Sequence, residues 1–262
     1  MRLHINVDHV ATLRNARGTP YPDPLDAARV CLDAGAHGIT AHLREDRRHI
    51  GDQDVERLRA TLRATFNLEM AATDEMVRIA IATRPDVVTL VPERREERTT
   101  EGGLDVVGNT ESLAKHIAAL QEADIKVSLF IAPDEKQVDA AYALGVEQIE
   151  LHTGEYAHAF GYPRPSSSDL LRPMVDAAQR EHRRLAQAAR LGRELGLEVA
   201  AGHGLTRDNV IAIAAIPLIE ELNIGHSVVA DAVLIGLDRA VRDLREAVNR
   251  GIAQRRSTAA RA

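Results

Sequence analysis

Cysteine is almost absent from this chain, which contains a single one, Cys31, among 262 residues. One cysteine cannot build a disulfide framework, and its rarity is typical of proteins that work in a reducing compartment. Cys31 lies in the helical pattern LDAARVCLDAG, where a free thiol behaves as a small hydrophobic side chain. We therefore expect it to be buried.

Long apolar runs and an excess of positive charge are also missing. No segment reaches the roughly 20 apolar residues of a membrane-spanning helix, and the start, MRLHINVDHV, lacks the apolar stretch of a signal peptide. The formal net charge of −6 gives no general attraction to nucleic acid or anionic lipid. We expect a cytoplasmic protein without a nucleic-acid partner or membrane contact.

Hydrophobic residues make up 45% of the chain, which is enough to bury the core of one large domain or two small ones. No break in composition marks a domain boundary, so we expect one catalytic domain over residues 1–250. The last residues, 251–262, are basic and lack apolar periodicity, and we expect them to be a frayed tail.

Short apolar runs alternate with longer amphipathic segments along the whole chain. Runs of this length, bounded by turn residues, are typical of buried parallel strands. The predicted strands are 3–7, 38–43, 66–71, 87–91, 126–131, 148–153, 198–202 and 221–225.

The segments between these strands carry helix start and stop signals. One helix is expected between Asp23-Pro24 and Gly35, with the proline in its first turn. Thr73 is expected to cap another helix, and Asp52 a third. The segment 228–248 predicts one long final helix.

Eight strands, each followed by a helix, predict a parallel α/β fold. Either a closed (β/α)8 TIM barrel or an open doubly wound sheet would fit this alternation. The count of eight, the chain length and the lack of a G-x-G-x-x-G motif at the first helix favour the barrel. In such a barrel the active site lies at the carboxyl ends of the strands.

Histidines gather at these predicted carboxyl ends. Any one of them is readily explained as a hydrogen-bonded structural residue, but packing alone explains six at one rim poorly. The six are His9, His42, His49, His152, His203 and His226. Glu69 adds an acid inside the apolar run FNLEMA, where burial is costly unless the group is paired or functional. Together they predict a site where protons move.

Glycines follow the last two strands, in AGHGLTRDN and LNIGHSVVAD. Backbone N–H groups at a helix N-terminus bind phosphate, and glycine lets the anion approach closely. The usual phosphate site of a TIM barrel lies in these two loops. The sequence therefore predicts a phosphate site here.

A second cationic cluster, REDRRHI, follows the second strand. Arg44 and His49 are expected to bind an anion. Arg47 and Arg48 fit better in a solvated loop, paired with the acidic residues 45–46.

Two long loops are expected on the same rim, where long loops are commonly lids or clamps. They are TLRNARGTPYPDP (12–24) and PERREERTTEGGL (92–104). The residues in them that could contact an anion are Arg14, Arg17, Thr99, Thr100 and the Gly102-Gly103 pair.

Seven motifs, spread from the first strand to the last, carry a resemblance to a known family. They are NVDHVATLRNARGT, HLREDRRHI, NLEMA, VPERREERTTEGGLDV, HTGEYA, AGHGLT and ELNIGHS. They resemble the pyridoxine 5′-phosphate synthase family of the deoxyxylulose-dependent vitamin B6 pathway. The resemblance implies a barrel that acts as a transferase-type synthase with no metal or organic cofactor.

The same resemblance implies a reaction and an assembly. The enzyme would condense 1-deoxy-D-xylulose 5-phosphate with 3-amino-2-oxopropyl phosphate, giving pyridoxine 5′-phosphate, phosphate and water. It would be a homo-oligomer, commonly an octamer. One segment, 157–173, looks longer than the family pattern.

Residue roles carry over only through the matching motifs. His42 and Glu69 would be proton acceptors, and His203 would be the proton donor. The deoxyxylulose phosphate would bind Asp8, His9, Arg44, His49 and Thr99. The aminoketone phosphate would bind Asn6, Arg17, Gly204, Gly225 and His226.

Three other functions remain open on the sequence alone. Another phosphate-binding barrel enzyme, such as a sugar-phosphate isomerase, an epimerase or a thiamine-phosphate-type synthase, would not need so many histidines. A metal-dependent barrel would use the histidines as ligands, which metal analysis would detect. A non-catalytic phospho-ligand binder would not need an acid in the third strand.

Overall fold

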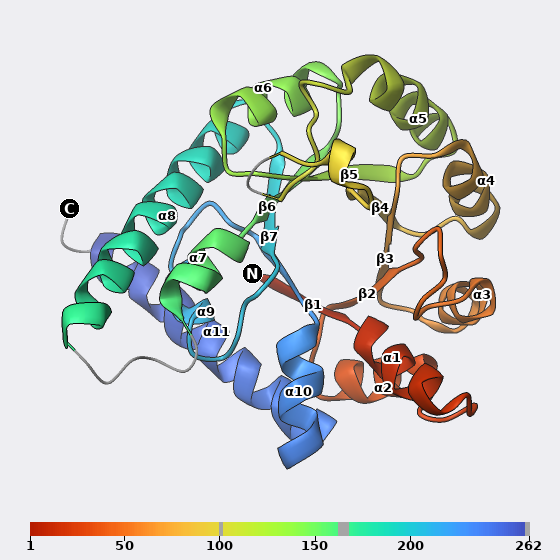
Figure 1. Cartoon of the computed structure of the whole chain (residues 1–262), viewed down its shortest axis with the longest axis horizontal. Coiled ribbons are helices and arrows are strands. Elements are labelled where there is room, and N and C mark those ends of the chain that lie inside the picture. The colour runs from red at the N-terminus through yellow and green to blue at the C-terminus, as the bar shows by residue number, and fades with distance from the viewer. Residues whose placement is uncertain (100–101, 162–167, 260–262) are drawn as a thin grey trace.

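Eight parallel strands form a closed barrel in chain order, and helices surround it (Figure 1). The computed structural model describes residues 1–99, 102–161 and 168–259. The strands are β1 Arg2–Asn6, β2 Gly38–His42, β3 Thr65–Met70, β4 Val87–Leu90, β5 Lys126–Ile131, β6 Gln148–His152, β7 Glu198–Gly202 and β8 Glu221–Ile224. Because β8 pairs with β1, the predicted TIM barrel is confirmed and the open sheet is excluded.

Most helices begin where the sequence predicts. They are α1 Asp8–Arg17, α2 Pro24–Asp33, α3 Asp52–Thr61, α4 Asp74–Thr83, α5 Thr110–Glu122, α6 Glu135–Ala143, α7 Gly154–Phe160, α8 Ser168–Glu194, α9 Val210–Ala214, α10 His226–Ile235 and α11 Leu237–Ala259. Thr73 caps α4, as expected, and Pro24 opens α2 after its cap Asp23. The cap of α3 is Gly51 rather than Asp52, because Asp52 is already helical.

The apolar core is the layer between the barrel and its helices. Alternate strand residues point outward into it, because successive side chains of a strand face opposite sides. Leu3, Leu68 and Val127 are at most 1% exposed. Cys31 on α2 is fully buried, as predicted, and burial raises the pKa of its thiol to about 12.

The inside of the barrel is polar, although TIM barrels usually fill this space with branched aliphatic residues. The inward side chains include Thr40, Asn67, Thr89, Ser128 and Asn223, none more than 6% exposed. Thr40 on β2 donates to the side-chain oxygen of Asn223 on β8, across the interior, at 3.1 Å. Polar side chains joined by hydrogen bonds therefore occupy this interior, the lumen of the barrel, in place of aliphatic ones.

Two expected elements differ from the structure. Residues 12–24 were predicted as a loop, but α1 occupies its first half, directly after β1. The predicted final helix 228–248 is two helices, because Gly236 separates α10 from α11 with a φ of 84°. Glycine adopts that left-handed conformation without steric penalty.

The C-terminal segment after residue 250 continues α11 as far as Ala259. Arg255 donates hydrogen bonds to the backbone oxygens of Ala214, Pro217 and Ile219. Within the segment 157–173, residues 162–167 lie outside the described residues. No helix in the described part of the chain is long and apolar enough to cross a membrane.

Candidate active site

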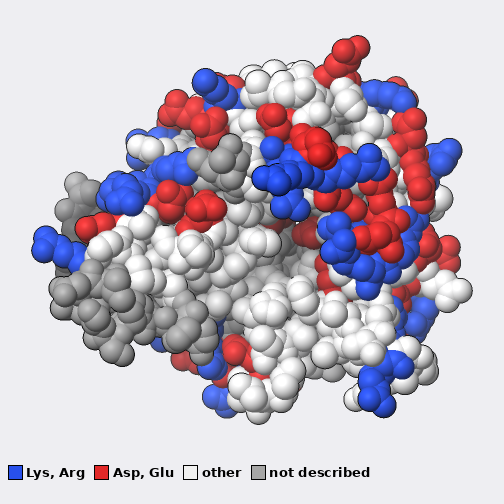
Figure 2. Space-filling model, in the orientation of Figure 1, with Lys and Arg blue, Asp and Glu red and all other residues white. Residues whose placement is uncertain are grey.

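A cavity of about 610 Å³ opens at the carboxyl ends of the strands. Figure 2 shows it as the hollow in the middle of this face, with charged side chains along one side and uncharged ones along the other. The predicted residues that line it are Asn6, Asp8, His9, His42, Arg44, His49, Glu69, His203, Gly204, Gly225 and His226. The fold thus brings together residues from the first to the last strand.

Asp8, at the start of α1, lies in the floor of the cavity and is 5% exposed. One of its carboxylate oxygens accepts from the backbone N–H of His42 at 2.8 Å, and the other from the Asn6 amide at 2.9 Å. The Asn6 amide also reaches Glu69 at 3.4 Å. Burial raises the pKa of Asp8 to about 6, although His42, Asn6 and Arg44 oppose the rise.

Two further carboxyls, Glu69 on β3 and Glu150 on β6, complete this acidic floor. Burial raises the pKa of Glu69 well above its usual value, and repulsion from Glu150 and Asp8 adds to the rise. Burial also raises the pKa of Glu150 to about 8, with Glu221 adding to it and a hydrogen bond from Asn223 opposing it. Near neutral pH the floor therefore holds protons that it can exchange.

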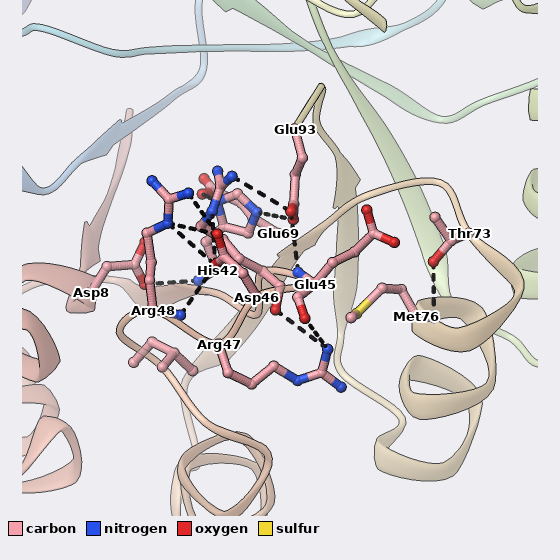
Figure 3. Close-up of polar contacts among 12 residues, drawn as sticks. Asp8, His42, Glu45, Asp46, Arg47, Arg48, Glu69, Thr73, Met76 and Glu93 are labelled. Atoms are coloured by element: carbon pink, nitrogen blue, oxygen red, sulfur yellow. Dashed lines mark hydrogen bonds and ion pairs between the residues drawn. The ribbon is translucent and has the colours of Figure 1, made fainter. Parts of the chain in front are cut away.

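His42 links the floor to the rim. Its Nε2 lies 2.9 Å from a carboxylate oxygen of Glu93, and its Nδ1 lies 4.0 Å from Glu69 (Figure 3). The other oxygen of Glu93 accepts from the backbone N–H of Glu45 and lies 3.7 Å from the Arg44 guanidinium. Burial acts to raise the pKa of Glu93, but these partners outweigh it and lower the pKa. An ionised Glu93 orients the His42 ring.

His152 and His203 form a stacked pair with ring centroids 4.9 Å apart, on the opposite side of the cavity. Burial, followed by the charge of Arg98, lowers the pKa of His203; burial, then repulsion from His203 and from Arg98, lowers the pKa of His152 to about 4. His203 has a φ of 84°, which is rare for a residue with a side chain. Such strain is typical of functional sites.

The remaining rim histidines lie on the β1–β2 side. His9 and His226 meet edge to face at 4.8 Å, and burial followed by repulsion from His226 lowers the pKa of His9. His49 accepts a hydrogen bond from the backbone N–H of Ile50 at 2.9 Å. Burial and then the charge of its neighbours lower its pKa to about 4. His49 is thus neutral, with its second ring nitrogen free to donate.

Two arginines of the loop after β2 form ion pairs away from the cavity, as the sequence predicts. Arg48 pairs with Asp46, the expected kind of partner (Figure 3). Arg47 pairs with Asp52 and Glu75 instead of with the acidic residues 45–46. Arg44 lines the cavity and forms two looser ion pairs, with Asp46 at 3.5 Å from Nε and with Glu93 at 3.7 Å, and its buried Nε has no hydrogen-bond partner within the described residues. An anion is a natural partner for it.

Gly204 and the start of α10 form the candidate second anion site. Gly204 has a φ of 75°, and His226 opens α10 directly after its N-cap, Gly225. Gly225 has no side chain to cap the helix, so α10 directs free backbone N–H groups at the cavity. A side chain at Gly225 would lie 2.9 Å from the Cβ of Asn6.

Four loop residues predicted to contact an anion lie elsewhere or cannot be placed. Arg17 is exposed at the end of α1 and does not line the cavity. Arg14 is bound by Asp54 on α3 in a two-pronged ion pair. Thr99 does not line the cavity, although its neighbour Arg98 does, and its buried hydroxyl lacks a partner among the described residues. Thr100 lies outside the described residues.

Asp8, His42 and Glu69 are the one group in the described chain that could hold a metal ion, with ligand atoms within 4.8 Å of one another. Both oxygens of Asp8 already accept hydrogen bonds from N–H donors. The raised pKa values of both acids mean that a cation would compete with protons for them.

Known proteins were compared with the chain. A family model described as "Pyridoxal phosphate biosynthesis protein PdxJ" matches residues 3–250. A pyridoxine 5′-phosphate synthase from Rhodospirillum rubrum is 54% identical over 245 residues, covering 94% of this chain and 93% of the relative. Another pyridoxine 5′-phosphate synthase, from Aliivibrio fischeri, is 55% identical over 242 residues, covering 92% of this chain and 94% of the relative. The chain belongs to the PdxJ family.

The PdxJ match spans all eight strands and every predicted site residue. Among solved structures, the chain is similar to thiamine phosphate pyrophosphorylase from Pyrococcus furiosus, with a TM-score of 0.57, 16% identity and 96% of each chain covered. At that identity the likeness shows the fold alone. It gives the thiamine-phosphate-type alternative no support against the PdxJ assignment.

The sequence reasoning missed four residues of the site: Glu93, Arg98, Glu150 and Asn223. Glu150 could have been found, because it stands two residues before His152 on the same strand and so faces the same side. Asn223 has the same relation to Gly225. Glu93 and Arg98 lie in an irregular segment after β4, where spacing predicts no direction.

Proposed function

We propose that this member of the PdxJ family is a pyridoxine 5′-phosphate synthase of the cytoplasm. It condenses 1-deoxy-D-xylulose 5-phosphate with 3-amino-2-oxopropyl phosphate, releasing phosphate and water. The observation that carries the proposal is the near-full-length identity of 54% to a relative of that name. The cavity supports it, because it offers two anion sites and several titratable groups around one space.

The two anion sites are the proposed phosphate sites. Arg44 and His49, with Asp8, His9 and Thr99 around them, hold the deoxyxylulose phosphate. The aminoketone phosphate binds at the other site, which consists of Asn6, Arg17, Gly204, Gly225 and His226. The arrangement brings the amine of one substrate to the carbonyl of the other over the acidic floor, where an imine can form.

His42 and Glu69 are the proposed proton acceptors. Imine formation, loss of phosphate, addition of water and ring closure each move a proton at a different atom, so one base cannot serve them all. A base works best when its pKa lies near the working pH, and burial raises the pKa of Glu69 in that direction. The ammonium group of the aminoketone would favour the ionised form of Glu69 as it binds.

His203 is the proposed proton donor. In the free site its pKa is lowered by the surrounding protein and by Arg98, so its ring is neutral. A phosphate dianion bound at the adjacent Gly204 loop would favour the protonated ring. The donor would then be charged only when substrate is present.

We further propose that the chain is a homo-oligomer, with an octamer as the expected form. Arg17 lies outside the cavity of its own chain, on the exposed end of α1. It can therefore bind a substrate phosphate only by entering the cavity of a neighbouring subunit.

The test is an assay of the purified protein with both substrates, in which the formation of pyridoxine 5′-phosphate is measured by fluorescence and mass spectrometry. Either substrate alone should give no product. Turnover of a single sugar phosphate, with no product from the pair, would favour an isomerase or epimerase and overturn the proposal.

A further inference from the structure

Inside the barrel, beneath the cavity, hydrogen bonds join Thr89 on β4 to Glu150 on β6 through three other side chains. Thr89 Oγ1 donates to Asn67 Oδ1 at 2.9 Å, and Asn67 Nδ2 to Thr40 Oγ1 at 3.5 Å. Thr40 Oγ1 donates to Asn223 Oδ1 at 3.1 Å, and Asn223 Nδ2 to Glu150 Oε2 at 2.6 Å. All four bonds run in the same direction and end on the carboxyl group.

All five members of this lumen chain are buried, with exposed fractions of 6% or less. Only the last two, Asn223 and Glu150, also line the cavity. Each threonine hydroxyl and each asparagine amide can donate one hydrogen bond and accept one. If both amides turn over and both hydroxyls rotate, every bond reverses: the two amides and Thr40 still donate one bond and accept one, and Thr89 at the far end changes from donor to acceptor.

We propose that Thr89, Asn67, Thr40 and Asn223 are positioning residues that hold the Glu150 carboxyl in one place whether or not it carries a proton. The ionised carboxylate accepts from Asn223, with the chain running toward it. The protonated carboxyl donates to Asn223, with the chain running away. Reversal breaks only hydrogen bonds, and no proton travels along the chain.

The burial of Glu150 explains why such a device is needed. A buried carboxyl that lost its hydrogen-bond partner on changing its charge would be destabilised. The charged groups that act on it are Glu69 on β3 and Glu221 on β8, and both resist its ionisation. Gly202 on β7 leaves room for its second oxygen, because a side chain there would overlap that atom.

This inference rests on the proposed function and adds to it that Glu150 exchanges a proton during the reaction. The direct test is Thr40→Val, which keeps the side-chain shape and breaks the chain in its middle. We expect kcat to fall about tenfold, the effect of one buried hydrogen bond, while both KM values change less than about twofold. The pKa of Glu150 should rise, because Asn223 loses the bond that polarises its amide.

Thr40→Ser restores the hydroxyl and should restore both kcat and the pKa. The matched control is Ser128→Ala. Ser128 pairs in register with Thr89, is 1% exposed, and has a hydroxyl with no partner within the described residues. The substitution removes a buried hydroxyl that lies in the same layer but is not part of the lumen chain. We therefore expect kcat and the pKa of Glu150 to stay as in the unchanged protein.

Glu150 is titrated in the free protein by its infrared carboxyl band, assigned by its loss in Glu150→Gln. This readout needs no turnover. If the unchanged protein shows no synthase activity but Thr40→Val still shifts the titration of the Glu150 band, the proposed function is overturned and the role of the lumen chain is supported. Thr89→Val, at the far end, gives the same test if Thr40→Val does not fold. The inference would be overturned if folded Thr40→Val or Thr89→Val left both the Glu150 band and kcat unchanged. It would also be overturned if Ser128→Ala changed them as much as Thr40→Val does.

Discussion

Glu69 shows how burial gives an ordinary carboxyl group the properties of a base. Its neighbours Glu150 and Asp8 carry the same charge, and the surrounding protein excludes water. Glu69→Gln keeps the shape and removes the titratable group. We expect kcat to fall roughly 10²-fold or more, as is typical when a general base is lost, with little change in either KM.

Steady-state kinetics with each substrate varied in turn would measure this change. Glu122→Gln is the control, because Glu122 is exposed at the end of α5, far from the cavity. Near-normal turnover of Glu69→Gln would remove Glu69 from the set of proton acceptors.

His203 allows a test of electrostatics at a single residue. The charge of Arg98 lowers the pKa of His203, so Arg98→Gln should raise it in the free protein. The ring resonances of His203, followed by NMR against pH, would measure the change. Arg94→Gln is the control from the same loop, because Arg94 pairs with Glu45 instead. A pKa that does not move in Arg98→Gln would mean that Arg98 does not reach the ring.

Sequence reasoning at the residue scale worked where a strand fixed the direction of a side chain. Glu69, His42 and His203 were placed at the cavity because each lies at the end of a predicted strand. Glu93 was not, since it acts through the turn after β4. No periodic pattern describes such a turn.

At the scale of elements, the loop from β2 to α3 places one arginine at the cavity and another in solvent. Arg44 lines the cavity, whereas Arg48 has a side chain 61% exposed and pairs with Asp46. Arg44→Ala should raise the KM for the deoxyxylulose phosphate about ten- to a hundredfold, the loss of a charge-assisted contact of roughly 1.5–3 kcal/mol. The KM for the aminoketone phosphate should change much less.

Arg48→Ala is the matched variant from the same loop and should leave both KM values unchanged. Kinetics with the second substrate saturating would compare the two variants. If Arg44→Ala weakens the aminoketone instead, the two phosphate sites have been assigned the wrong way round.

The sequence predicted all eight strands but not every helix. Local signals such as the Thr73 cap and the proline that opens α2 were read correctly. The helix α1 lacks one, because its N-cap is Val7 and forms no side-chain hydrogen bond. The break at Gly236 was missed because apolar residues continue on both sides of it. The polar lumen also escaped prediction, since its hydrogen bonds join strands distant in sequence.

At the scale of the whole molecule, the buried carboxyls make stability depend on pH in an unusual direction. Unfolded Asp and Glu titrate near pH 4, whereas burial raises the pKa to about 6 for Asp8 and about 8 for Glu150. The folded chain therefore binds more protons than the unfolded chain between these values. From these groups, the free energy of unfolding should be greatest at and below about pH 4 and should fall as the pH rises toward 8.

Urea unfolding across this range would measure the slope. Glu150→Gln removes one of the titrating groups, so its stability should vary less with pH than that of the unchanged protein. A stability that rises steadily from pH 5 to pH 8, equally in both proteins, would contradict the assignment of protons to the floor of the cavity.

The exposed position of Arg17 has a consequence for mixtures of defective chains. If each cavity receives this arginine from a neighbour, then Arg17→Ala and Glu69→Gln damage different halves of a shared site. Each variant alone should be inactive, yet subunits exchanged between the two should form some cavities with an intact floor and an intact arginine. Co-expression of the two variants should therefore recover part of the activity, whereas two chains that serve only themselves would stay inactive together.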